Sequence, residues 1–186
     1  MKVKLNDIAE IQFGLYAQPS KDGTIPYLQA KHFTIDGQYS LSSDTFLDED
    51  EKVSANFLKE GDVLFAGKGF RFFAAEYKSE FGKAVASSIF FIIKPNLNRV
   101  IPAYLALVLN MPKSILHFQQ SGAGSSIPSI RKNELADFEI NLIPLQQQKK
   151  VVELQELYLK DLQITENLIK QKQSIFQTAI STIIYK

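Results

Sequence analysis

The chain has 186 residues, of which 45% are hydrophobic and 11% aromatic, with 21 Lys and Arg against 20 Asp and Glu. This composition excludes a disordered chain, which would be poor in aromatic residues, and suits one domain with an appendage. The absence of cysteine excludes a disulfide scaffold, a thiol nucleophile and any cysteine-ligated metal site, and two histidines are too few for a histidine-rich one.

The first twenty residues do not resemble a signal peptide. Asp7 and Glu10 stand where such a peptide needs an apolar stretch, and no run of about 18 apolar residues follows anywhere in the chain. We therefore expect a soluble, cytoplasmic protein with no membrane partner, no metal and no cofactor.

Up to residue 143, short apolar runs alternate with turn-forming residues. Residues 88–93 (SIFFII) are rich in β-branched and aromatic side chains, which favours a buried strand. Turns are predicted at residues 36–37, 60–62 and 95–96. Residues 101–110 (IPAYLALVLN) predict a helix, with Pro102 at its first position. The fold class expected for residues 1–143 is therefore α+β, with a curled, mainly antiparallel sheet.

The composition changes at Pro144, because residues 145–186 contain neither glycine nor proline and mix Gln, Lys and Glu with aliphatic residues. We predict one long C-terminal helix over residues 144–186. At about 1.5 Å per residue, about 38 helical residues would reach roughly 57 Å, too long to bury an apolar stripe against its own domain.

The apolar residues of this helix follow a heptad pattern, which predicts an intermolecular coiled coil, with polar positions at Asp161, Thr165 and Lys172 that could set its register. A helix folded back onto the core as a hairpin is the alternative. The predicted partner-helix residues are Leu154, Tyr158, Leu162, Leu168, Ile169, Ile175, Phe176 and Ile183.

The net charge of +1 hides an uneven distribution. Residues 1–60 carry a balance of −4, residues 61–135 of +5, residues 136–143 of −2 and residues 144–186 of +2. Polyanion binding depends on the local field on one face, so the near-zero total does not exclude it. Ordinary surface variation would also explain a local balance of this size.

No arrangement of residues predicts an enzyme. Residues 61–69 (GDVLFAGKG) fail as a phosphate loop, because five residues instead of four separate the first glycines and no Ser or Thr follows Lys68. The sequence FAGKG also fits a short motif by which amino-methyltransferases bind S-adenosylmethionine. The Asn/Asp-Pro-Pro-aromatic catalytic element that those enzymes need is missing from this sequence. His32 and His117 are more simply core or surface residues than catalytic ones, and the acidic run at residues 48–51 suggests a turn or a helix start. We expect a non-catalytic protein.

Two segments of the positively charged region have compositions that favour nucleic-acid binding. Residues 67–71 (the glycine segment) combine glycines, cations and aromatic residues, with Phe72 and Phe73 following, and residues 119–132 (the serine segment) combine amides, hydroxyls and two adjacent cations. Such groups neutralise phosphates and contact base edges. The DNA-binding residues predicted from charge and loop position are Lys31, Lys68, Phe70, Arg71, Gln120, Ser125, Ser126, Arg131 and Lys132.

The order of these features resembles the specificity subunits of type I restriction-modification systems. The resemblance rests on KLNDIAEIQFG, IPYLQAKHFTIDG and FLKEGDVLFAGKG, and most of all on the serine segment leading into IPSIRKNELADFEINLIPLQQQKKVVEL before the long helix. It implies a target-recognition domain that binds half of a split duplex DNA site. The catalytic work would belong to partners, an adenine methyltransferase subunit and a restriction subunit.

The resemblance also raises the question of pairing, because subunits of this family usually contain two such units and this sequence contains one. We expect a homodimer through the helix, reading a palindromic interrupted site. Pairing with a different half-subunit is the alternative within the family. An assembly module whose globular domain binds protein and not DNA is the alternative outside it.

Overall fold

The structure, a computed structural model, describes residues 1–34, 37–40, 43–122 and 127–185. It divides the chain into two compact units, Met1–Gln148 and Lys149–Lys186. Each unit is described by itself. The predicted functional boundary after residue 143 stays a prediction.

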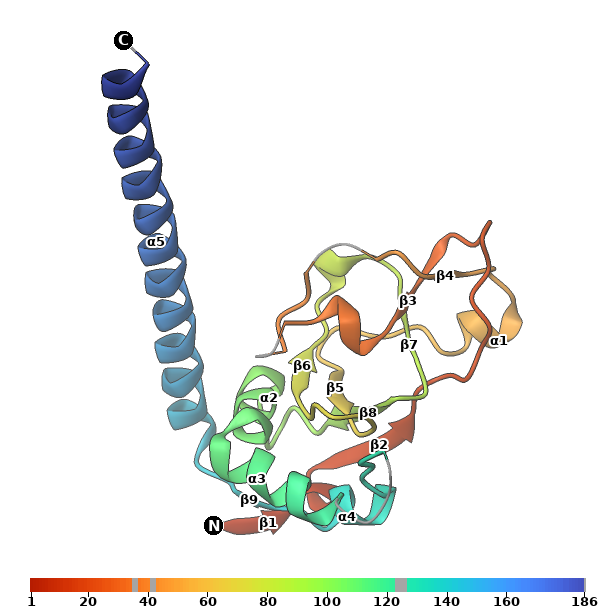
Figure 1. The fold of residues 1–186 in the computed structure, drawn as a ribbon. Helices are drawn as coiled ribbons and strands as arrows, with labels where there is room; N and C mark the ends of the chain where they lie inside the picture. Colours follow the sequence, from red (N-terminus) through yellow and green to blue (C-terminus); the bar gives the residue numbers. More distant parts are fainter. Residues whose placement is uncertain (35–36, 41–42, 123–126, 186) are drawn as a thin grey trace. The chain divides into compact units, whose positions relative to one another are not determined.

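The largest sheet of the first unit is antiparallel throughout (Figure 1). The middle strands β8 and β5 carry four consecutive buried residues each, Phe90–Ile93 and Val63–Ala66. A strand buried on both faces reads as a continuous apolar run, which is why residues 88–93 were recognisable in the sequence. In spatial order its strands are β2 (Ala9–Phe13), β8 (Phe90–Pro95), β5 (Val63–Ala66) and β6 (Ala74–Glu76).

Two smaller sheets complete the strands found in the described residues. β1 (Lys2–Lys4) pairs antiparallel with β9 (Glu139–Asn141), which brings the start of the chain beside the end of the first unit (Figure 1). β3 (Ile25–Leu28) lies between β4 (Phe46–Leu47) and β7 (Val85–Ala86), antiparallel to the first and parallel to the second. The predicted α+β class with mainly antiparallel sheets is confirmed. The strands are divided among three sheets, and the sequence did not predict the parallel pair.

The helices of the first unit begin where local chemistry favours it. The Asp50 carboxylate accepts a hydrogen bond of 2.6 Å from the Val53 amide and caps α1 (Glu51–Ser54), so the acidic run is a helix start. Prolines occupy the first positions of α2 (Pro102–Asn110) and α3 (Pro112–Ser121). The other short helices are α4 (Lys132–Ala136) and the 3-10 turns η1 (Leu5–Asp7), η2 (Ala30–His32) and η3 (Ser79–Phe81).

Aromatic side chains fill much of the core of the first unit. The rings of Phe33, Phe73 and Phe90 lie with their centroids 5.5 to 5.9 Å apart in tilted and edge-on pairs. Such geometries are favourable beyond the burial of apolar area itself. This cluster supports the turns that carry the glycine segment and η2.

A buried glutamine closes the first unit. Gln148 has no exposed surface; its carbonyl oxygen accepts from the Ile101 amide at 2.9 Å, and its amide group donates to the carbonyls of Arg99 and Ile143 at 3.0 and 2.8 Å. These bonds satisfy three backbone groups that no strand or helix would otherwise pair. The side chain thereby joins the segment before α2 to the first turn of α5.

Helix α5 runs over Leu145–Ile184, and its residues from Lys149 onward make up the second unit. The long C-terminal helix predicted from the sequence is therefore confirmed. All eight predicted partner-helix side chains are exposed, from 39% for Leu162 to 78% for Ile183. Among the described residues, no helix is both long enough and apolar enough to span a membrane.

Candidate nucleic-acid interface

The two predicted DNA-binding segments lie side by side. Lys68 and Ser129 form an isolated antiparallel bridge. The amide of Gly69 donates to the Pro128 carbonyl at 2.9 Å, and the amide of Ile130 donates to the Gly67 carbonyl at 2.8 Å. Backbone hydrogen bonds thus hold together two turns that are about 60 residues apart in the sequence.

Two positions of the glycine segment are suited to glycine alone. A Cβ on Gly67 would lie 2.4 Å from the ring of Phe91, a distance that real contacts do not reach. Gly69 has a φ of 111°, which residues with a side chain rarely adopt. The glycines of the segment therefore have a structural task, whereas the sequence interpretation gave them only the task of close approach to DNA.

Exposed cations and aromatic rings gather around the bridge. Lys68, Arg131 and Lys132 are exposed, and none of them forms an ion pair with any residue that the structure describes. The Lys132 ammonium lies 5.8 Å from the ring centroid of Phe13, which in turn packs on Phe91, the ring that contacts Gly67. We call Phe13, Lys68, Phe70, Arg131 and Lys132 the basic-aromatic patch.

The aromatic residues of the glycine segment separate into two groups. Phe70 is 82% exposed, whereas Phe72 and Phe73 are buried, with Phe72 stacked on Phe65. The interpretation of Phe72 and Phe73 as part of a binding surface is therefore wrong, because the chain turns back into the core directly after Arg71. Phe13, which is 58% exposed, is the second exposed aromatic residue of the patch besides Phe70.

Arg71 is already bound within the protein. Its guanidinium donates from Nη2 to the carbonyls of Ala30 and Phe33, at 2.6 and 3.0 Å, and lies 4.8 Å from the ring centroid of Phe73. The side chain thus holds turn η2 against the glycine segment. Arg71 places a positive charge near the patch. Its hydrogen bonds to the two backbone carbonyls both come from Nη2, at one end of the guanidinium.

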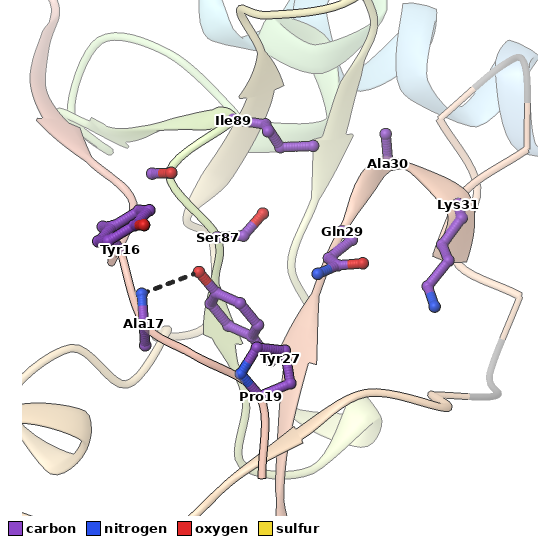
Figure 2. A pocket seen from close by; sticks show the side chains of 10 residues that line it. Tyr16, Ala17, Pro19, Tyr27, Gln29, Ala30, Lys31, Ser87 and Ile89 are labelled. Carbon is purple, nitrogen blue, oxygen red and sulfur yellow. Dashed lines mark hydrogen bonds between the residues drawn. The ribbon is translucent and has the colours of Figure 1, made fainter.

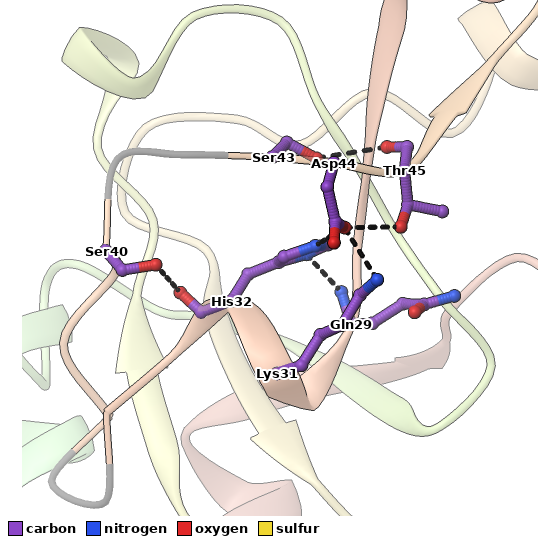
Figure 3. A network of polar contacts seen from close by, with 7 residues as sticks. All are labelled: Gln29, Lys31, His32, Ser40, Ser43, Asp44 and Thr45. Carbon is purple, nitrogen blue, oxygen red and sulfur yellow. Dashed lines mark hydrogen bonds and ion pairs between the residues drawn. The ribbon is translucent and has the colours of Figure 1, made fainter. Parts of the chain in front are cut away.

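Turn η2 presents Lys31 in a polar network (Figure 3). The Asp44 carboxylate receives the Lys31 ammonium at 2.6 Å, the His32 ring nitrogen Nε2 at 2.9 Å and the Thr45 hydroxyl at 2.8 Å. The hydrogen bond from His32, followed by those from Lys31 and Thr45, holds the pKa of the Asp44 carboxyl well below its usual range. Among the predicted DNA-binding cations, Lys31 therefore carries a compensating acid.

Neither histidine has the surroundings of a catalytic base. The Nδ1 atom of buried His32 accepts from the Gln29 amide at 3.0 Å, so Nε2 carries the hydrogen and donates a hydrogen bond to Asp44 at 2.9 Å. Both ring nitrogens are therefore used. The His117 ring packs on Phe118 and Phe138, with centroids 5.6 and 5.2 Å apart. Both contacts are those of structural residues.

The remaining predicted residues lie around the serine segment. Gln120 is exposed in the last turn of α3, whereas Ser125 and Ser126 lie outside the described residues. Sequence reasoning missed Phe13: in a strand whose buried residue is Ile11, alternation would place Phe13 on the buried side as well. No pattern in the sequence signals that the end of β2 exposes it.

Comparison with solved structures gives the same fold. A structure of a type I R-M system, described for its complex assembly and conformational transition, matches with a TM-score of 0.60 and 18% identity over 98% of this chain and 43% of that chain. The HsdS subunit from Thermoanaerobacter tengcongensis matches with a TM-score of 0.56 and 17% identity, over 93% of this chain and 39% of that one. The S subunit from M. genitalium matches with a TM-score of 0.56 and 14% identity, over 96% and 44%.

The chain thus spans less than half the length of these relatives. Comparison with curated proteins gave no match. The model of one protein family, described as the type I restriction modification DNA specificity domain, matches residues 1–172. This match covers the sheets, the paired segments and most of α5, and the chain belongs to that family.

Proposed function

We propose that this chain is a non-catalytic, cytoplasmic DNA-recognition subunit of a type I restriction-modification complex. It binds half of a split duplex site and directs a partner adenine methyltransferase subunit, and a restriction subunit, to that site. The observation that carries the proposal is the pairing of the glycine and serine segments, which brings unpaired cations and exposed rings together in a member of the specificity family.

The cations supply affinity. The side chains of Lys68, Arg131 and Lys132 form no ion pair with any described residue, so they are available to replace the counterions of DNA phosphates; the Glu134 carboxylate accepts a hydrogen bond of 2.7 Å from the Arg131 backbone amide only. Each phosphate contact lowers the slope of log affinity against log salt by about 0.9. Arg71 adds positive charge nearby while keeping its internal partners, whereas Lys31 would contact a phosphate in exchange for its ion pair with Asp44.

Polar and aromatic groups of the two segments supply sequence discrimination. The Gln120 amide suits adenine, Phe70 offers an apolar contact to a thymine methyl group, and the hydroxyls of Ser125 and Ser126 are of a kind that suits base edges or phosphates. The backbone hydrogen bonds of Gly69 and Ile130 hold the two segments together at one point, and positioning is what base readout requires.

Helix α5 supplies the partner surface. Leu154, Tyr158, Leu162, Leu168, Ile169, Ile175, Phe176 and Ile183 are exposed at heptad-related positions, an arrangement that a second helix would cover in a coiled coil. A homodimer through this surface would place two recognition domains about a twofold axis and read a palindromic interrupted site. Pairing with a different half-subunit would give an asymmetric site instead.

A salt-dependent binding experiment tests the DNA proposal. Fluorescence anisotropy with a random-sequence duplex should give an affinity that falls with added salt, and Lys68→Ala and Lys132→Ala should each reduce the salt slope by about 1. Lys52→Ala, an exposed lysine in α1 outside the patch, is the matched control and should change nothing. An affinity independent of salt, or equal values for all three variants, would favour the assembly module instead.

Methylation-sensitive sequencing of the source genome tests specificity. A split, adenine-methylated motif that disappears when this gene is deleted is the expected result. A palindromic motif supports the homodimer, and an asymmetric motif supports pairing with another half-subunit. Unchanged methylation after deletion would contradict the role in directing a methyltransferase.

A further inference from the structure

A hollow of about 490 Å³ lies next to turn η2 (Figure 2). Its lining includes Tyr16, Tyr27, Gln29, Lys31, Ser87 and Ile89. These residues come from the loop after β2, from the end of β3 with turn η2, and from the connection between β7 and β8. Apart from Lys31, none of them was predicted to bind DNA.

A buried hydroxyl points to a ligand for this hollow. Ser87 is only 4% exposed, and its Oγ has no hydrogen-bond partner among the described residues. Figure 2 shows its side chain in the middle of the group, between Tyr16 on one side and Gln29 on the other. Buried polar atoms are nearly always paired with protein or with a bound molecule such as water, so an unpaired hydroxyl on a residue that lines a hollow marks a position where a bound molecule would be stabilised.

The walls of the hollow suit a flat ring. The Tyr27 hydroxyl donates to the Leu15 carbonyl at 2.7 Å and accepts from the Ala17 amide at 3.3 Å, so this ring is held in place (Figure 2). Tyr16 lines the same hollow and is 72% exposed, which leaves its ring free to stack. Aromatic faces and aliphatic side chains around a single unpaired hydroxyl match a planar heteroaromatic group with a hydrogen-bonding edge.

The hollow adjoins the glycine segment through hydrogen bonds. The Ile89 carbonyl accepts from the Gly67 amide at 2.9 Å, and the carbonyl of Ala30, another residue of the lining, accepts from Arg71. A DNA strand bound at the patch would therefore pass close to it. Because a base in an intact duplex lies recessed in a groove, only a base that has left the stack could enter a hollow of this kind.

We propose that this hollow binds a nucleobase displaced from the stack of the bound DNA, with Ser87 bonding its edge and Tyr16 stacking on its face. The inference rests on the DNA-binding function proposed above. It assigns to the recognition domain a second binding mode, in addition to contacts made in the grooves.

The test compares duplexes that differ by one nucleotide. The full chain is titrated with a paired duplex, with four duplexes carrying one bulged A, C, G or T, and with a duplex whose bulge is abasic. At least one base-bearing bulge should bind about tenfold more tightly than the abasic bulge, a factor typical of stacking plus one hydrogen bond. The abasic bulge has the same kink, so this comparison removes the effect of DNA shape.

Two variants connect the preference to the hollow. Ser87→Ala and Tyr16→Ala should each remove most of it while leaving the affinity for the paired duplex unchanged. Ser114→Ala is the matched control, since Ser114 is also buried but donates to the Val108 carbonyl at 2.6 Å outside the hollow. Its loss should lower the melting temperature, whereas Ser87→Ala, which removes an unpaired hydroxyl, should leave the melting temperature unchanged or raise it.

The outcomes separate the two proposals. If no duplex binds, the DNA-binding function fails and this inference fails with it. If the paired duplex binds but base-bearing and abasic bulges bind equally, or Ser87→Ala keeps the preference, only the inference is overturned. Where the preference exists, displacement of the bulged base by millimolar deoxynucleoside monophosphates would show that a free nucleotide also fits, and no displacement would limit the hollow to bases within a strand.

Discussion

The two units of this chain differ in how far their apolar side chains are exposed to solvent. In Met1–Gln148, the leucine, isoleucine, valine and phenylalanine side chains of the central strands β5 and β8 are buried. In Lys149–Lys186, the eight predicted partner-helix side chains are all at least 39% exposed. A unit that buries its apolar surface is complete as a fold, whereas an exposed heptad stripe requires a second surface. The predictions below separate these two kinds of residue.

The largest effect is expected from a charge in the exposed stripe. Phe176→Asp should convert an assembly of two chains into single chains, because an unpaired carboxylate in an apolar seam costs about 3 kcal/mol or more per chain. Light scattering measures the mass. Gln177→Asp places the same charge one residue further along, on the polar line that includes Glu156, Gln163 and Lys170, and should leave the mass unchanged. A mass equal to one chain for the unmodified protein would contradict the homodimer.

A large loss of stability is expected from Gln148→Ala in the first unit. The substitution leaves the Ile101 amide and the carbonyls of Arg99 and Ile143 without partners, at a cost of about 3 kcal/mol in the free energy of unfolding. Urea denaturation followed by circular dichroism measures this loss. The neighbouring Gln147 is exposed, so Gln147→Ala should stay within about 0.5 kcal/mol of the original protein. Equal stability of the two variants would refute the bonding role of Gln148.

A smaller loss separates a bound cation from a free one. Arg71→Ala should lower the free energy of unfolding by about 2 kcal/mol, because the half-buried carbonyls of Ala30 and Phe33 lose a charged donor. Lys68→Ala should leave stability within about 0.5 kcal/mol, since Lys68 is exposed. Chemical denaturation of both variants checks the contrast. It would not hold if Arg71→Ala proved as stable as Lys68→Ala.

The smallest effect is a pH dependence at the Asp44 network. A carboxyl whose pKa is lower in the folded protein than in the unfolded chain stabilises the fold above its unfolded pKa, and this contribution is lost as the pH falls through the folded pKa. The difference in melting temperature between the original protein and Asp44→Asn should therefore shrink as the pH falls from about 6 to about 3. Thermal melts at a series of pH values measure it, and a constant difference would contradict the assigned pKa direction.

Much of the fold could be predicted because burial leaves a pattern in the sequence. The continuous apolar run of β8, the proline that begins α2 and the absence of glycine and proline from α5 each follow from a local rule. The parallel pairing of β3 with β7 could not be predicted, since it joins Tyr27 to Val85 through two-residue contacts with no periodicity of their own. The division of the strands among three sheets was missed for the same reason.

The candidate site could be predicted in its segments but not in its details. Composition identified the glycine and serine segments, but the bonds between them, Gly69 to Pro128 and Ile130 to Gly67, are backbone contacts that no side-chain pattern encodes. The role of Arg71 depends on partners 38 and 41 residues away, and the role of Lys31 depends on Asp44, which is 13 residues away. Charge alone could not separate cations with internal partners from those without them.

The bridge between Lys68 and Ser129 has a consequence for how such a surface can change over time. The bonds between Gly69 and Pro128 and between Ile130 and Gly67 use only main-chain atoms, so they do not depend on which side chains stand at positions 68, 70 and 129. Those side chains can be exchanged while the two glycines keep the turns in place. If this surface binds DNA as proposed, a few substitutions of exposed side chains would change its target sequence while the backbone of the two turns stays the same.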